Sequence, residues 1–229
     1  MFSIISKEFT SLGKNIKSII VVAIILCITL GIAKLVSLFE DQLGNLGVAE
    51  TPYSMGLLLT VLLASPLFIF ALSHNVINEE VKTRTIRFLA TKTNRTTIII
   101  GKFLGALLFW FLILLITTLL IIIYSHEFYY IELLQSVVFI SYYLSLAVFL
   151  SVLINSTVLT NFLGIALPIV MTILGIWSSN SNNILLQTYS YITPYHYFFQ
   201  GDKLLPFVVV VFPIIFTSIS IILFQKRDL

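Results

Sequence analysis

Apolar residues run along this chain in long stretches, and short polar or charged segments separate them. Each stretch has about the 20 residues that an α-helix needs to cross the hydrocarbon core of a bilayer. We expect spans at residues 18–38, 56–77, 103–123, 133–154, 158–177 and 205–224. The fourth and fifth form one uncharged region, which the polar residues Asn155–Thr157 divide. The pattern predicts an all-α integral membrane protein with six transmembrane helices.

Two further segments are amphipathic but too short to span. Residues 1–17 repeat apolar side chains at spacings of three and four, which is typical of a helix lying in the membrane interface: Phe2, Ile5, Phe9, Leu12 and Ile16. Between the fifth and sixth spans, a polar segment is followed by an aromatic one that belongs at the headgroup level. We expect short, partly re-entrant helices there, before the last span.

Composition supports the membrane assignment. The chain has 229 residues, of which 59% are hydrophobic and only 10% charged. A soluble domain of this length could not bury so much apolar surface. The net charge of +3 is small and segregated, so we expect no nucleic-acid partner. A single cysteine, Cys27, permits no disulfide within the chain.

The basic residues predict the orientation. If the N-terminus lies inside, 11 of the 13 basic residues face the cytoplasm. Three of them precede the first span, six lie between the second and third spans, and two follow the sixth. The outer side then receives mostly acidic residues: Glu40, Asp41, Glu50, Glu127, Glu132 and Asp202. We expect a multi-pass protein of the plasma membrane with both termini cytoplasmic. Abundant Ile, Asn and Lys indicate an AT-rich, bacterial source.

No catalytic, cofactor or metal site is expected on this chain. The sequence contains neither the G-x-x-x-x-G-K-[ST] phosphate loop nor the H-E-x-x-H metal motif. Its histidines, His74, His126 and His196, have no ligand spacing. No span has a charged residue near its centre, which disfavours proton- or ion-coupled transport. We therefore do not expect an enzyme.

The loop at residues 78–102 contains six basic residues, more than orientation requires. Apolar side chains lie among them, and Glu79 and Glu80 stand near its start. This pattern fits a short helix that docks on another protein while its basic face meets lipid headgroups. It fits equally well a solvated basic loop that touches phospholipid.

The same loop resembles the first cytoplasmic loop of ABC-2 type transporter permeases, the membrane subunits of type V ABC exporters. The resemblance lies in Glu80, Thr85, Asn94-Arg95 and Gly101-Lys102, taken in order. It extends over all 229 residues, through the amphipathic first helix, the six spans and the terminal "FQKRDL". The chain departs from the family at Arg84, where the family often has Gly, and at Thr93-Asn94, where Pro-Ser is common.

The resemblance implies a permease subunit that works with a separate cytosolic ABC ATPase, on which ATP and Mg²⁺ would bind. Residues 78–102 would be the coupling loop, with the docking residues Glu79, Glu80, Val81, Thr85, Ile86 and Phe88. A second copy or a homologous permease would complete the pathway. The favoured cargo is an amphipathic or hydrophobic molecule, namely an antimicrobial or cytolytic peptide such as a phenol-soluble modulin or a lantibiotic, with drugs or lipids as further candidates. Two alternatives remain: a membrane anchor or sensor that transports nothing, and an ATP-independent channel.

Overall fold

A computed structural model describes residues 1–38, 52–179, 181 and 183–227, and every regular element in these ranges is a helix. Five of the helices are long and apolar enough to cross a membrane, and the bent pair formed by α1 and the start of α2 would make a sixth. The predicted class, an all-α membrane protein, is confirmed. The predicted outer residues Glu40, Asp41 and Glu50 lie outside the described ranges.

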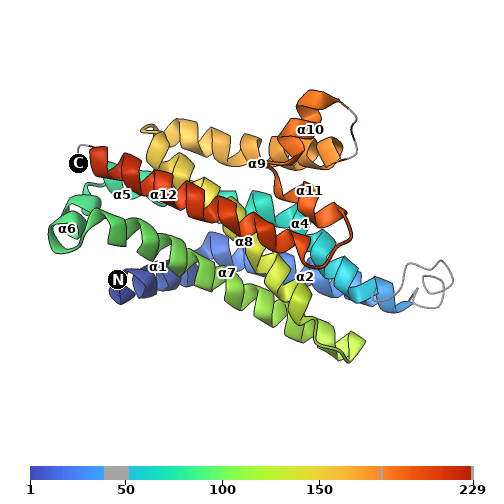
Figure 1. Cartoon of the computed structure of the whole chain (residues 1–229). Coiled ribbons are helices and arrows are strands. Elements are labelled where there is room, and N and C mark those ends of the chain that lie inside the picture. The colour runs from blue at the N-terminus through green and yellow to red at the C-terminus, as the bar shows by residue number, and fades with distance from the viewer. Residues whose placement is uncertain (39–51, 180, 182, 228–229) are drawn as a thin grey trace.

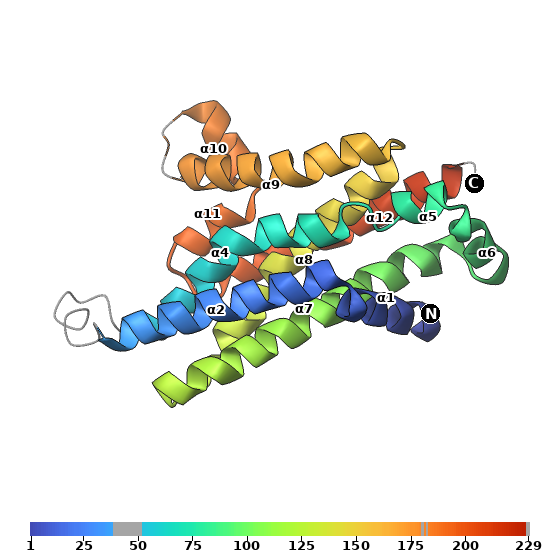
Figure 2. The same cartoon turned by 180° about the vertical axis from the view of Figure 1, so that it is seen from behind.

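The spanning helices form one bundle with α8 at its centre (Figures 1 and 2). The bundle consists of α2 (Ile16–Leu38), α4 (Pro52–Ser73), α7 (Arg95–Ser125), α8 (Tyr130–Leu153), α9 (Thr157–Ser179) and α12 (Val211–Lys226). A 3-10 helix, η1 (Leu205–Val210), leads directly into α12. Helix α8 is the most buried span, and Phe139, Tyr143 and Ala147 on it have no exposed surface. Apolar side chains on α9 and α2 instead face outward.

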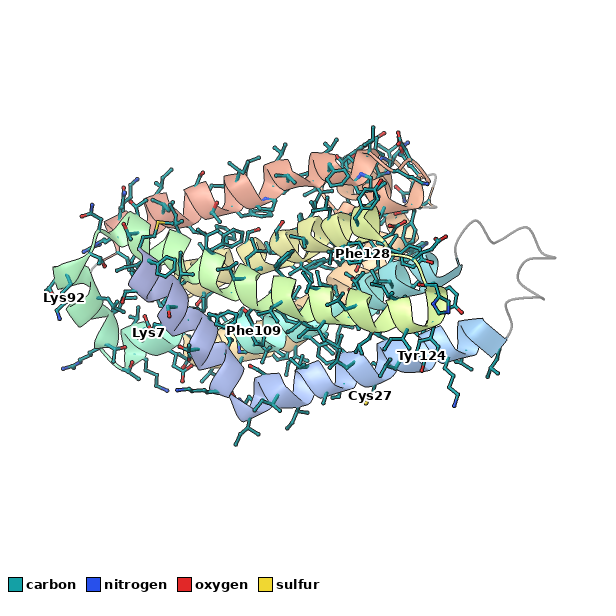
Figure 3. All side chains as sticks on the ribbon, turned by 90° about the horizontal axis from the view of Figure 1, so that it is seen from below. Lys7, Cys27, Lys92, Phe109, Tyr124 and Phe128 are labelled. Atoms are coloured by element: carbon teal, nitrogen blue, oxygen red, sulfur yellow. The ribbon has the colours of Figure 1, made fainter. Side chains whose placement is uncertain are left out.

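Helix α1 (Phe2–Lys14) meets the start of α2 at a bend of 71°. It lies against α7 at the end of the bundle that also carries α5, α6 and the C-terminal end of α12 (Figures 1 and 2). We call this the basic end. Lys7 and Lys92 lie there, whereas Tyr124 and Phe128 lie at the opposite end (Figure 3). The two chain termini are therefore at the same end of the bundle.

The two helix boundaries beside the loop at residues 78–102 differ from the sequence prediction. Helix α4 ends at Ser73 rather than at residue 77, and a turn follows before α5 (Asn78–Lys82). The side chains of Asn75 and Asn78 bond to α9 across this turn, and Asn is a poor helix former. Helix α7 begins at Arg95, so the last eight residues of the predicted loop 78–102 are helical. Burial of Ile98 and Ile99 stabilises this extension.

The segment between α9 and η1 forms two short helices, α10 (Ile184–Ser190) and α11 (Pro194–Phe199). Tyr195 on α11 is fully buried and reaches the backbone of α4 at Leu62. Gly175 on α9 makes this insertion possible, because a Cβ there would lie 2.2 Å from the Tyr195 ring. Helix α11 is therefore packed into the bundle rather than resting on its surface.

Candidate functional site at the basic end

The chain between α4 and α7 folds into two short helices, α5 (Asn78–Lys82) and α6 (Thr85–Lys92). They are joined at Arg84, whose φ of 59° is left-handed. This conformation costs an L-residue with a side chain about 1–2 kcal/mol. The hydroxyl groups of Thr83 and Thr85 lie 3.0 Å apart, and that of Thr85 also donates to the Glu80 carbonyl oxygen. The turn is thus held by its own polar groups.

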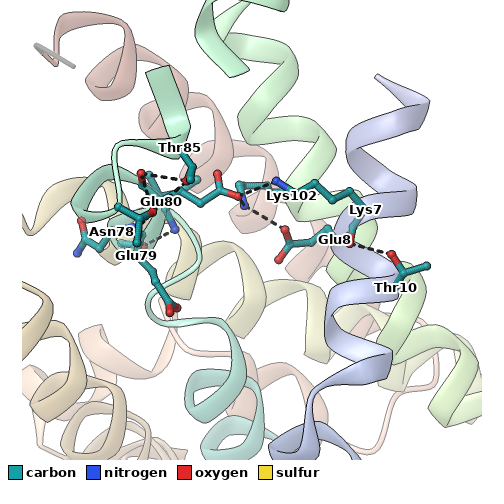
Figure 4. A network of polar contacts seen from close by, with 11 residues as sticks. Lys7, Glu8, Thr10, Asn78, Glu79, Glu80, Thr85 and Lys102 are labelled. Atoms are coloured by element: carbon teal, nitrogen blue, oxygen red, sulfur yellow. Dashed lines mark hydrogen bonds and ion pairs between the residues drawn. The ribbon is translucent and has the colours of Figure 1, made fainter. Parts of the chain in front are cut away.

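Lys102 is the centre of an ion-pair network that joins this loop to the bundle. Its side chain is only 3% exposed, and its Nζ lies 3.0 Å from Glu8 Oε2 on α1 and 3.0 Å from Glu80 Oε1 on α5. Lys7 on α1 adds a longer contact of 3.5 Å to the same Glu80 oxygen. Figure 4 shows these side chains converging from α1, α5 and α7.

Such a network matters because a buried ammonium group is costly unless it is paired. The two carboxylates and the two lysines balance in charge. Removing Lys102 would leave both carboxylates without their buried cation, whereas Lys7, with 60% of its side chain exposed, contributes less. The position of α5 is therefore linked electrostatically to both α1 and α7.

The pair Gly101 and Gly105 explains how α1 comes so close to α7. A Cβ at Gly105 would lie 2.8 Å from the Ile5 carbonyl oxygen and 2.7 Å from Glu8 Cβ. A Cβ at Gly101 would lie 2.9 Å from Ile4 Cγ2. The Gly-x-x-x-Gly spacing lets two helix backbones approach. Here it brings Glu8 within reach of Lys102.

A second polar cluster joins the start of the loop to α8 and α9. Ser151 Oγ on α8 accepts hydrogen bonds from the backbone N–H groups of Ile77, at 3.0 Å, and Asn78, at 3.1 Å. Asn75 accepts a 2.6 Å hydrogen bond from Thr160 and donates to Asn161. The two bonds to Ser151 satisfy N–H groups at the start of α5, where a helix has no partners of its own for them.

The C-terminal end of α12 is fastened to the same region by two arginines. Arg95 donates to the carbonyl oxygens of Phe224, Gln225 and Arg227, at 3.1, 2.9 and 2.7 Å. These carbonyls lie at the end of α12, where a helix lacks N–H groups to pair with all of them, and a cation there also complements the helix dipole. The Arg227 guanidinium contacts Asn78 Oδ1 and the Val152 carbonyl oxygen. Burial lowers the pKa of Arg227 from its usual value.

The predicted docking residues occupy different environments. Glu79 and Thr85 are exposed, Val81 is half-buried, and Glu80 is engaged with Lys102. Ile86 is 1% exposed and packs inside the chain with Ile77, Ile98 and Ile99. The Phe88 side chain lies outside what the structure describes, although its backbone belongs to α6.

From the sequence, Lys102 and Arg95 help to orient the chain and support the family resemblance, but no contact is predicted for them, for Arg227 or for Asn78. The importance of Lys102 and Arg95 could have been inferred, because Gly101-Lys102 and Asn94-Arg95 belong to the ordered motifs that suggested the family. No local signal marks Asn78 or Arg227, since their contact joins residues 149 positions apart. Among the described residues, no group of three or more His, Cys, Asp or Glu side chains could hold a metal ion.

Comparison with known proteins shows that the chain belongs to a known family. The family model described as "ABC-2 family transporter protein" matches residues 3–229, which is nearly the whole chain. This match confirms the resemblance inferred from the loop motifs. No curated protein matches the chain.

Proposed function

Because this chain belongs to the ABC-2 transporter family, in which it is a permease subunit of an ABC transporter, we propose that it moves cargo out of the cell with a separate ATPase subunit. The ATPase would dock on α5 and α6. One observation supports this role above the others: Lys102 joins Glu80 of α5 to Glu8 of α1 across α7. A force applied to the short helices would therefore reach the spans.

The exposed part of the loop is the proposed docking surface. Glu79 is exposed and has no ion-pair partner among the described residues, so it is available to a basic group of an ATPase. Thr85, Val81 and Phe88 would contribute further contacts. Glu80 and Ile86 would act from inside the chain, the first by holding Lys102 and the second by packing α6 against α7. This division refines the roles expected from the sequence.

Two linkages would carry movement of the loop into the membrane. The first runs from Glu80 through Lys102 to α1 and α7. The second runs from Asn78 to Arg227 at the end of α12, and from the backbone of Ile77 to Ser151 on α8. ATP binding and hydrolysis would take place on the partner, so this chain would act mechanically. The basic end would then face the cytoplasm, in agreement with its excess of Lys and Arg.

The cargo is proposed to be amphipathic or hydrophobic, with antimicrobial or cytolytic peptides favoured over drugs and lipids. Helices α2 and α9 expose many large apolar side chains, including Ile24, Phe162 and Ile173, and α4 lies between them (Figure 2). A second permease, identical or homologous, would cover part of this surface. An apolar pathway between two such faces would suit cargo that enters from the membrane.

Co-purification tests the docking proposal. The chain would be co-expressed with an ABC ATPase of the same genome, beginning with any encoded beside it. Glu79→Lys should reduce the ATPase recovered with the permease, because it replaces attraction by repulsion at an exposed position. Glu127→Lys, at an exposed position on the opposite end, is the matched control. Glu80→Lys is less informative, because it would also break the internal pair with Lys102.

Export is tested separately in liposomes that contain the complex and a fluorescently labelled cytolytic peptide. ATP-dependent accumulation of the peptide would support the proposal. Equal ATPase recovery with Glu79→Lys and the parent would argue that the loop meets lipid or solvent instead. ATP hydrolysis without movement of peptide, drug or lipid would favour a membrane anchor, and flux by the permease alone would favour a channel.

A further inference from the structure

A polar cleft of about 510 Å³ opens at the basic end, beside the ion-pair network rather than within it. It lies between the start of α2, the turn after α4, α5 and the start of α9. Its lining side chains are Lys17, Asn75, Lys82, Thr83, Thr157 and Asn161, with Glu79 as the one acidic member. The cleft is therefore built from segments that are distant in the sequence.

The chemistry of the cleft favours an anion of low charge. Among the described residues, the ammonium groups of Lys17 and Lys82 have no carboxylate partner. The Asn161 side-chain oxygen accepts from Asn75 and lies 2.8 Å from His74 Nε2, so its amide N–H groups remain available as donors. Two lysines and one glutamate leave the lining with a net charge of +1. A singly charged phosphate fits this balance better than a nucleotide polyphosphate.

An apolar stripe continues from the cleft into the membrane. On α4, Leu59, Leu63, Leu67 and Ala71 recur every four residues and are all exposed, and Asn75 of the cleft follows at the same spacing. Helices α2 and α9 lie on either side of α4 along this face (Figure 2). From Ala71 to Leu59 a helix rises about 18 Å, close to the hydrocarbon thickness of one leaflet, which is roughly 15 Å.

We propose that the cleft binds the phosphodiester headgroup of a membrane phospholipid, with its acyl chains along the α4 stripe. The phosphate lies between Lys17 and Lys82, where the Asn161 amide can donate to it. Basic pockets between helices at the cytoplasmic side of a membrane are suited to such headgroups. A bound lipid would link α2, α5 and α9, which the ion pairs of Lys102 do not join. This site goes beyond the proposed transport function and does not depend on it.

Native mass spectrometry of the purified permease, titrated with phosphatidylglycerol, tests the assignment. The parent should bind one molecule saturably, and more tightly than phosphatidylcholine with the same chains. Lys17→Gln combined with Lys82→Gln should weaken binding about thirtyfold, since each lysine near a headgroup contributes about a fivefold factor. Lys14→Gln with Lys92→Gln removes the same charge from two other exposed lysines and should change binding by less than threefold.

Further arms separate a lipid from a soluble phosphate ester. Leu67→Asn should weaken lipid binding, whereas Leu108→Asn, at an exposed position of α7 away from the stripe, should not. Glycerol 1-phosphate should fail to displace the lipid at equal concentration, and displacement would assign the cleft to a soluble ester instead. If both double-lysine variants lose the same amount of lipid affinity, the attraction is diffuse and electrostatic. If neither variant loses affinity, the lipid binds elsewhere. Both results would overturn the proposal. The assay contains neither ATPase nor cargo, so its outcome is independent of the transport experiments.

Discussion

The hydroxyl group of Tyr195 donates a 2.9 Å hydrogen bond to the carbonyl oxygen of Leu62, in the middle of α4. Pro66 stands four residues after Leu62 and has no N–H, so the helix cannot supply this bond itself. Within a bilayer, a backbone carbonyl without a partner costs several kcal/mol. Tyr195 therefore satisfies a group that Pro66 frees, and α11 is fixed against α4 as a result.

This relationship predicts a coupling between the two side chains. Tyr195→Phe should destabilise the parent by about 2 kcal/mol, because the Leu62 carbonyl loses its partner. In a Pro66→Ala background the restored N–H can bond to Leu62, so the same change should cost less than half as much. Melting temperatures of the four proteins in detergent would measure the coupling. Equal costs of Tyr195→Phe in both backgrounds would contradict it.

Lys102 should be among the most sensitive positions outside the apolar core. Lys102→Met leaves Glu8 and Glu80 with only the exposed Lys7 as a nearby cation, and breaking a buried ion pair in this way costs about 3 kcal/mol or more. Lys92→Met, at an exposed position of α6, should be nearly neutral. The melting temperature and the proteolytic release of α1 are the readouts.

A rescue variant separates charge from packing at the same site. Adding Glu8→Gln and Glu80→Gln to Lys102→Met removes the unpaired carboxylates, so part of the stability should return. Failure to recover any stability would mean that Lys102 acts through the packing of its long side chain rather than through its charge.

The close contact between α1 and α7 predicts an order among glycine substitutions. Gly105→Ala places a Cβ against the Ile5 backbone and should cost about 1–3 kcal/mol. Gly101→Ala meets Ile4 Cγ2 at 2.9 Å and Ile4 Cβ at 3.1 Å, but no backbone atom closer than 3.8 Å, and should cost less. Gly31→Ala meets no atom within 4 Å and should be neutral or stabilising. Thermal unfolding of the three variants checks the order, and a reversed order would show that α1 does not pack on α7 as described.

Arg84→Gly should stabilise the loop, because glycine adopts the left-handed conformation at position 84 without the penalty of a side chain. The gain should be about 1 kcal/mol at most, since glycine also increases the entropy of the unfolded chain. Arg87→Gly, within α6, should be destabilising by about 1 kcal/mol. Hydrogen exchange of the α5 and α6 amides would report both effects. Faster exchange in Arg84→Gly than in the parent would argue that the left-handed backbone at position 84 is not strained.

Most of the architecture could be read from the sequence, because transmembrane helices are specified by local hydrophobicity. A stretch of about 20 apolar residues in a bilayer has only one way to satisfy its backbone, which is to form a helix. This is why the spans, the amphipathic first helix and the short helices before the last span could all be predicted. The family resemblance also depended on local motifs, and the order of Glu80, Thr85, Arg95 and Lys102 was sufficient to suggest it.

What the sequence left undecided depends on contacts between distant residues. Lys102 looks like any other basic loop residue until α1 and α5 bring Glu8 and Glu80 to it, and Arg227 has no visible role until α12 ends beside Asn78. The boundaries of α4 and α7 shifted for the same reason, because polar contacts with α8 and α9 and the burial of Ile98 outweighed local propensity. Hydrophobicity is a property of each segment by itself, but the pairing of buried charges and polar groups exists only after the helices have packed.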